Sequence, residues 1–199
     1  MPNATSKGFP PWSRRTFNRP RRCESVAAAA PPKSGPSTQA AQADRRQLLF
    51  LLDTAYDHVS WHGPNLRGSL RGVTPALAAW RPAPERHNIW ELIVHAAYWK
   101  YVAWRRLTGA KRGSFPLSGS NFITRPQVDT KQALNEDLAL LDRMHSTLRE
   151  AAATVRPDDL DRGSAQRGVT KRALLTGVAA HDLYHAGQIQ LLKRMAGAR

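Results

Sequence analysis

Hydrophobic residues recur at steps of three and four along the chain from residue 44 onward, a spacing that gathers them on one face of a helix. The first such segment begins at Asp44, a candidate N-cap, and ends at Gly63-Pro64. Its apolar face carries Leu48, Leu51, Leu52, Ala55 and Val59. His62 is expected on the same inner face, and His58 at its edge.

A second helix is predicted from Asn88 to Gly109, after a proline-rich connection that has room for a short helix at residues 76–80. Asn88 has the character of an N-cap, and Glu91 stands at the capping-box position three residues later. Gly109 suits the end of a helix. His95 is expected on the flank of the buried face of this helix.

Two further helices follow the same pattern. The apolar face of the third carries Leu134, Leu138, Leu141, His145, Leu148, Ala152 and Val155. Pro157 ends this helix, because the residue before a proline is disfavoured in helical conformation. The fourth runs over residues 170–195, with His181 and His185 at the centre of its apolar arc and Asp182 outside the arc.

Four amphipathic helices, without a competing alternating strand pattern, predict an all-α four-helix bundle. The long connections argue against the simplest up-down order. Residues 1–43 are rich in Pro, Ser, Ala and Arg and are predicted to be a disordered tail, which leaves residues 44–199 as the folded domain. A targeting segment or an artefactual extension are the alternative interpretations of the tail.

The formal net charge is +15, which raises the question of nucleic-acid binding. Residues 1–43 carry seven Lys and Arg against the single Glu24, and the other arginines are spread along the domain rather than gathered in one stripe. A solvated basic surface is therefore favoured over a nucleic-acid partner. The longest apolar run, Leu48 to Leu52, is too short to span a membrane, so no membrane partner is expected.

Cys23 is the only cysteine, so the chain cannot form an internal disulfide or a cysteine-based zinc knuckle. This usage fits a reducing compartment, and we expect a cytoplasmic location. Any bound metal must be held by His, Asp or Glu side chains.

His181 and His185 are the main candidates for metal binding, because residues four apart on a helix project their side chains from the same face. Each of them could instead make an ordinary hydrogen bond inside the bundle. Their position on an otherwise apolar face favours a shared ion, since unpaired imidazole nitrogens there would be costly. His95 supplies a third ligand, and three imidazoles leave a coordination position open, as in catalytic sites.

Other residues compete for roles near this site. His62 is a candidate catalytic acid, base or hydrogen-bond donor beside the ion, and the pair His58 and His62 is a weaker candidate for a second metal site. His145 is interpreted as a core histidine, with pocket contact as the alternative. Glu91 is an alternative carboxylate ligand, although capping already accounts for it.

The segments Ile89-Trp90-Glu91-Leu92-Ile93-Val94-His95 and His181-Asp182-Leu183-Tyr184-His185-Ala186-Gly187-Gln188-Ile189 resemble the DinB-like metalloprotein superfamily. The resemblance extends from about Leu48 to Gly197. It implies a four-helix bundle of up-down-down-up order with one nickel or zinc ion held by His95, His181 and His185. It also implies hydrolysis or transfer that involves a low-molecular-weight thiol, reactions described for some members.

The leading hypothesis is therefore a metal-dependent hydrolase or thiol-dependent transferase that acts on a small-molecule substrate. One divalent metal ion, zinc or nickel, is the expected cofactor, with a low-molecular-weight thiol as an additional candidate. The alternative is a non-catalytic, stress-related binding or scaffold protein whose histidines hold a structural ion or none. A homodimer is compatible with either hypothesis.

Overall fold

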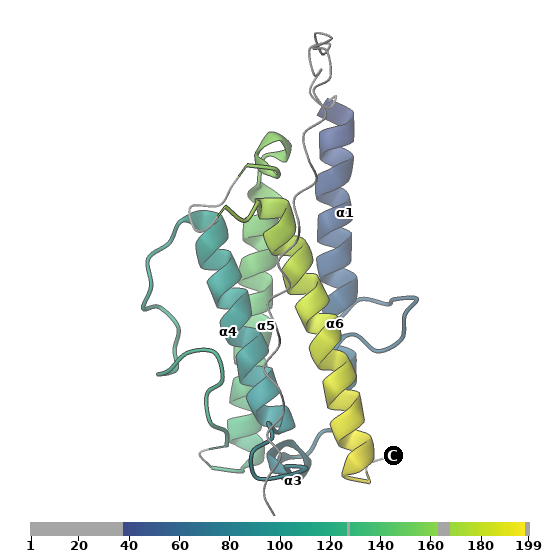
Figure 1. Ribbon diagram of the computed structural model, residues 1–199, viewed down its shortest axis with the longest axis vertical. Helices are drawn as coiled ribbons and strands as arrows, with labels where there is room; N and C mark the ends of the chain where they lie inside the picture. Colours follow the sequence, from purple (N-terminus) through teal and green to yellow (C-terminus); the bar gives the residue numbers. More distant parts are fainter. Residues whose placement is uncertain (1–37, 127, 163–167, 198–199) are drawn as a thin grey trace, which may run out of the picture. The chain divides into compact units, whose positions relative to one another are not determined.

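The structure is a computed structural model that describes residues 38–126, 128–162 and 168–197. Within these ranges the chain is helical, with no strand (Figure 1). The elements are α1 (Thr38–Tyr56), α2 (Leu66–Ser69), α3 (Pro75–Ala79), α4 (Ile89–Thr108), α5 (Lys131–Thr154), the 3-10 helix η1 (Pro157–Asp159) and α6 (Lys171–Met195). The all-α prediction is confirmed.

The ends of the three later long helices follow local signals in the sequence. The Asn88 side chain accepts a hydrogen bond of 2.7 Å from the Glu91 N–H at the start of α4. Thr130 and Thr170 cap α5 and α6 in the same way. Gly109 ends α4 in the left-handed conformation, with φ of 78°, which a residue without Cβ adopts at little cost.

The start and end of α1 differ from the prediction. The helix begins at Thr38 rather than at Asp44, which lies inside α1 and accepts a hydrogen bond of 2.8 Å from Arg172. It ends at Tyr56, so Val59 stands 99% exposed. The apolar spacing in the sequence continues for one turn beyond the end of the helix. Spacing alone does not show whether residues in that stretch pack against the rest of the protein. The rest of the predicted tail, residues 1–37, lies outside the described residues.

Helices α4 and α5 form the most extensive contact and run in the same direction. Trp90 Nε1 donates to Asp137 near their N-termini, at 2.8 Å, and Lys100 lies beside His145 farther along both helices. Figure 1 shows α1 and α6 running in the opposite direction to this pair. The long connections between α1 and α4 and between α4 and α5 make this arrangement possible.

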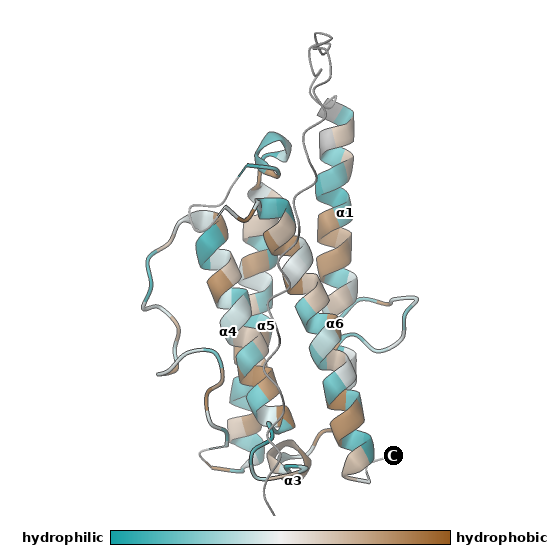
Figure 2. Cartoon of the chain, in the orientation of Figure 1, coloured by the Kyte–Doolittle hydropathy of each residue, from teal (hydrophilic) through white to brown (hydrophobic). Residues whose placement is uncertain are grey.

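The interior contains two apolar clusters. One fills the end of the bundle near α2 and α3 and includes Trp90, Ile93 and Ile189, all fully buried. The other fills the end near the start of α1 and includes Leu52, Leu148 and Leu175. Figure 2 shows the corresponding hydrophobic patches along the helices, interrupted by polar positions. None of the described helices is both long and apolar enough to cross a membrane.

A layer of buried polar side chains lies among these helices. Lys100 of α4 and Asp182 of α6 form an ion pair in which both side chains are 1% exposed. Lys100 also lies 3.4 Å from His145 Nδ1, and the His145 ring stacks on Tyr56 at 3.7 Å. The expectation that Asp182 lies outside the buried arc of its helix was therefore wrong, because Lys100 supplies an interior partner for its charge.

Candidate metal centre

Three imidazoles from two helices converge at one point. His95 projects from α4, and His181 and His185 project from α6. The Nε2 atom of His181 lies 3.1 Å from Nε2 of His95 and 3.0 Å from Nε2 of His185. Their candidate ligand atoms all lie within 4.8 Å of one another, and in the described part of the chain no other His, Cys, Asp or Glu cluster has metal-binding geometry.

The loop between α4 and α5 fixes the orientation of His95. The His95 Nδ1–H donates to the backbone carbonyl of Asn121 at 3.1 Å. The Asn121 side chain in turn accepts a hydrogen bond of 3.0 Å from Trp99 Nε1. Phe122 stacks on the His95 ring at 3.9 Å. His95 is 4% exposed, so this packing leaves its ring little freedom to turn.

A side chain one turn farther along α6 fixes His185. Its Nδ1 lies 2.6 Å from Oε1 of Gln188, whose amide nitrogen donates to the Tyr184 hydroxyl at 3.0 Å. This hydrogen bond indicates that Gln188 orients the His185 ring.

These hydrogen bonds decide which ring nitrogens carry protons. The backbone carbonyl that faces Nδ1 of His95 can only accept, so this ring carries its proton on Nδ1 and presents a lone pair at Nε2. The Gln188 oxygen imposes the same tautomer on His185. Nε2 of His181 carries at most one proton and can donate it to only one of these lone pairs. One close nitrogen pair is therefore left without a proton between them, an arrangement that a bound cation would stabilise.

Burial keeps the three rings neutral. Burial, together with the repulsion that a protonated His185 would exert, lowers the pKa of His95 from 6.5 to about 4. Burial and the two neighbouring imidazoles lower the pKa of His181 to about 3. The pKa of His185 is also lowered, mainly by burial. Neutral imidazole is the form that binds a metal, so the site is ready to bind an ion near neutral pH without releasing protons from these rings.

The donor set fits a divalent metal ion. Two Zn–N bonds of about 2.0–2.1 Å at a tetrahedral angle separate their nitrogens by about 3.3 Å, close to the spacing around His181. Each of the two rings with an assigned tautomer also has its second nitrogen tied to an acceptor, the usual arrangement for ligating histidines. Three nitrogen ligands leave room for a water or a substrate atom.

The three histidines open into a pocket of about 720 Å³. The other lining residues are mostly apolar, and Leu191 and Met195 remain more than half exposed at its edge. Arg86 is the only Lys, Arg, Asp or Glu among them. The pocket therefore favours a small molecule with an apolar body, and any charge on that molecule is expected to be negative.

Two of the rival histidines lie elsewhere. The expectation that His62 faces inward beside the ion was wrong: α1 ends at Tyr56, and His62 is exposed in the turn that follows. It does not line the pocket. His58 is also exposed and lies 2.7 Å from Asp57, and among the described residues neither histidine belongs to a group of three or more candidate metal ligands.

His145 occupies the interior, as its core interpretation requires. It is 7% exposed, stacks on Tyr56 and lies outside the lining of the pocket. Burial, with the nearby Lys100 ammonium, lowers its pKa to about 2. His145 is therefore a neutral member of the buried polar layer.

Glu91 serves a different purpose from those considered for it. Its carboxylate accepts hydrogen bonds of 2.5 and 2.9 Å from Arg81 and lies 2.9 Å from His87 Nδ1. Only half of the predicted capping box forms. The Glu91 N–H donates to the Asn88 side chain, but the Glu91 carboxylate binds the Arg81 guanidinium instead of the Asn88 N–H. These bonds fix the chain before α4, and they place Glu91 outside the group of candidate ligands.

His87 and Phe122 are pocket residues that the sequence did not reveal. The rings of His87 and His95 stack on opposite faces of Phe122, at 3.6 and 3.9 Å. The two residues belong to loops before and after α4, where no periodic pattern applies. Only the tertiary structure shows that both residues line the pocket beside the three histidines.

A family model described as the DinB superfamily matches residues 58–189, a range that includes all three converging histidines. The matched range begins after α1 ends. No curated protein and no solved structure gave a match.

Proposed function

The chain belongs to the DinB superfamily, and from this premise we propose that it is a metal-dependent enzyme that holds one divalent ion through His95, His181 and His185. The observation that carries the proposal is the close approach of three Nε2 atoms, two of which, on His95 and His185, present lone pairs to the centre. Zinc and nickel are the favoured ions, because both accept neutral imidazole.

The proposed reaction is displacement on an electrophilic small molecule: the sulfur of a thiol or the oxygen of water forms the new bond, the bond to the leaving group breaks, and the proton of the nucleophile passes to the leaving group or to solvent. When bound, a divalent ion lowers the pKa of a coordinated thiol or water and so supplies a nucleophile near neutral pH. The chain's own contribution is to hold the rings rigidly, through Asn121 and Gln188, and to enclose the substrate in apolar walls. Arg86 is placed to pair with an anionic group of the substrate.

Hydrolysis and thiol transfer share this site and differ in the nucleophile. The large, mostly apolar pocket favours an organic thiol over water as the nucleophile, because the carbon atoms of such a thiol can contact the pocket walls and contribute binding energy. A low-molecular-weight thiol is therefore the favoured second substrate. The discriminating assay is turnover of one electrophile by the zinc- or nickel-loaded protein, with and without a panel of such thiols.

Metal analysis of the purified full chain tests the proposal. Wild-type protein is expected to retain about one divalent ion per chain after dialysis, and His185→Ala to retain almost none, because two imidazoles alone bind weakly. His58→Ala is the matched control: it removes an exposed histidine and should leave the metal content unchanged. Wild-type protein without stoichiometric metal, or equal metal content in the wild type and His185→Ala, would show the proposal to be wrong.

The hydrogen bond from His185 to Gln188 should tune the affinity for the ion. Gln188→Leu is expected to weaken zinc binding by about 10- to 100-fold while the protein stays folded, because the ring loses the acceptor that fixes its tautomer. A competition titration against a chromophoric chelator measures this change. Gln190→Leu, on the same helix and outside the pocket, is the control. Equal affinities in the two variants would contradict the orienting role.

A further inference from the structure

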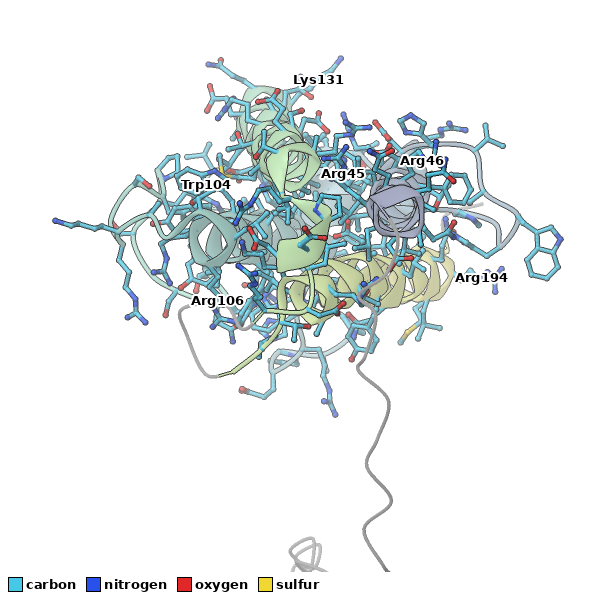
Figure 3. All side chains as sticks on the ribbon, turned by 90° about the horizontal axis from the view of Figure 1, so that it is seen from above. Arg45, Arg46, Trp104, Arg106, Lys131 and Arg194 are labelled. Atoms are coloured by element: carbon cyan, nitrogen blue, oxygen red, sulfur yellow. The ribbon has the colours of Figure 1, made fainter. Side chains whose placement is uncertain are left out.

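A second pocket, of about 680 Å³, lies between α4 and the segment that follows it, residues 112–121. Among the described residues, three arginines line it, Arg105, Arg106 and Arg112, and no carboxylate does. Figure 3 shows Arg106 at the end of α4, on the opposite side of the helix from Trp104. The pocket is concave and partly open to solvent, with the loop as one wall, which suits a small molecule better than an extended polymer.

The charge of these arginines is not balanced by the protein. Arg105 is 6% exposed, and its Nε atom is buried without a hydrogen-bond partner, as is that of Arg106. Within the described part of the chain, no carboxylate lies within ion-pair distance of Arg105, Arg106 or Arg112. The C-terminal end of α4 attracts cations and offsets part of the cost, but it leaves the buried N–H group unpaired.

Aromatic rings form another part of the wall. Phe115 packs edge-on against Tyr98 at 5.4 Å, and Trp99 lies beside the guanidinium of Arg106 at 6.0 Å. The Tyr101 hydroxyl accepts hydrogen bonds from the Gly113 and Ser114 N–H groups, which tie the loop to α4. The pocket thus combines guanidinium groups that have no carboxylate partner among the described residues with ring surfaces, a combination that fits an anionic group joined to an apolar or aromatic body.

We propose that this pocket binds a small carboxylate or phosphate compound with an aromatic or apolar body, at a site separate from the three-histidine centre. Arginine guanidinium groups bind either anion through paired N–H donors. Trp99 and Asn121 line the pocket, and the Asn121 carbonyl holds His95. The bound compound therefore contacts the loop that orients a candidate metal ligand, while its binding does not require the metal.

Calorimetric titration of the full chain with phenyl phosphate, benzoate and uncharged benzyl alcohol tests the proposal. At least one of the two anions is expected to bind about tenfold more tightly than benzyl alcohol, and the tighter anion identifies the preferred group. Arg112→Ala, on an exposed side chain, and Arg106→Ala, on a half-buried one, should each weaken that binding by at least about fivefold. Arg105→Met should weaken it further.

Two control variants separate this pocket from the histidine site. His185→Ala and Arg86→Ala should change the affinity for the anion by less than about twofold, because neither residue lines this pocket. The proposal is overturned if neither anion binds below about 10 mM, if the Arg112 and Arg106 variants bind as the wild type does, or if binding is lost in His185→Ala and Arg86→Ala instead. Circular dichroism spectra confirm that each variant is folded.

Discussion

Lys100→Met is expected to lower the free energy of unfolding by about 3–5 kcal/mol, the usual result when one partner of a buried ion pair is removed. Lys100 and Asp182 are each 1% exposed in their side chains. Methionine fills a similar volume, so the loss comes from a carboxylate left in the interior without its cation. Oδ1 of Asp182 already lacks a hydrogen-bond partner, which leaves Lys100 as the main source of stabilisation for this charge.

Urea unfolding followed by circular dichroism measures the change. Lys111→Met is the matched control, because Lys111 is exposed in a loop, and it should alter the free energy of unfolding by no more than about 0.5 kcal/mol. The double variant Lys100→Met, Asp182→Asn should recover part of the loss, since it removes the orphaned charge. A loss below about 1 kcal/mol in the single variant would mean that Asp182 does not depend on Lys100.

The metal-free protein is expected to lose stability steeply as the pH falls from 6.5 toward 4. The pKa of His145 is lowered to about 2 by burial and by Lys100, whereas an unfolded histidine takes up its proton near pH 6.5. Between these two pKa values the unfolded state binds more protons than the folded state. The free energy of unfolding therefore decreases as the pH decreases. His145 alone accounts for about 3 kcal/mol between pH 6.5 and 4. His95 and His181 add to the same loss, because their pKa values are also lowered.

Thermal unfolding in the presence of a chelator, from pH 8 to pH 4, measures this dependence. His145→Gln, which does not titrate and keeps an acceptor near Lys100, should make the profile shallower below pH 6.5. His58→Gln changes an exposed histidine and should leave the profile unchanged. A melting temperature that stays constant across this range would contradict the prediction, because it would mean that keeping the buried histidines neutral does not destabilise the folded protein at low pH.

Local chemistry explains which helix boundaries the sequence predicted correctly. The cap of α4 depends on one side chain and the N–H groups that follow it, so Asn88 marks it directly, and the predicted start of the fourth helix at residue 170 coincides with the Thr170 cap of α6. The end of α1 depends on packing instead. Val59 fits the apolar period, but the chain turns away before it can be buried. The inward position expected for His62 failed for the same reason.

Within the candidate site, spacing and family resemblance were enough to group three histidines, but not to describe their surroundings. His181 and His185 lie on one helix, where a step of four fixes their relation. Asn121, Phe122 and His87 reach the site from loops, where no periodicity links sequence to position. The anion pocket also depends on such a loop, because residues 112–121 cover the arginines of α4.

The sequence by itself determined the all-helical architecture, the Asn88 cap of α4 and the same-face placement of His181 and His185, because each rests on interactions within a few residues. The tertiary structure alone decided that Asp182 is buried, since its partner Lys100 is 82 residues away on another helix. It also decided the tautomers of His95 and His185 and the outward position of His62. These features depend on which side chains and backbone groups come into contact in the folded protein. The type of a residue in the sequence does not specify its contact partner.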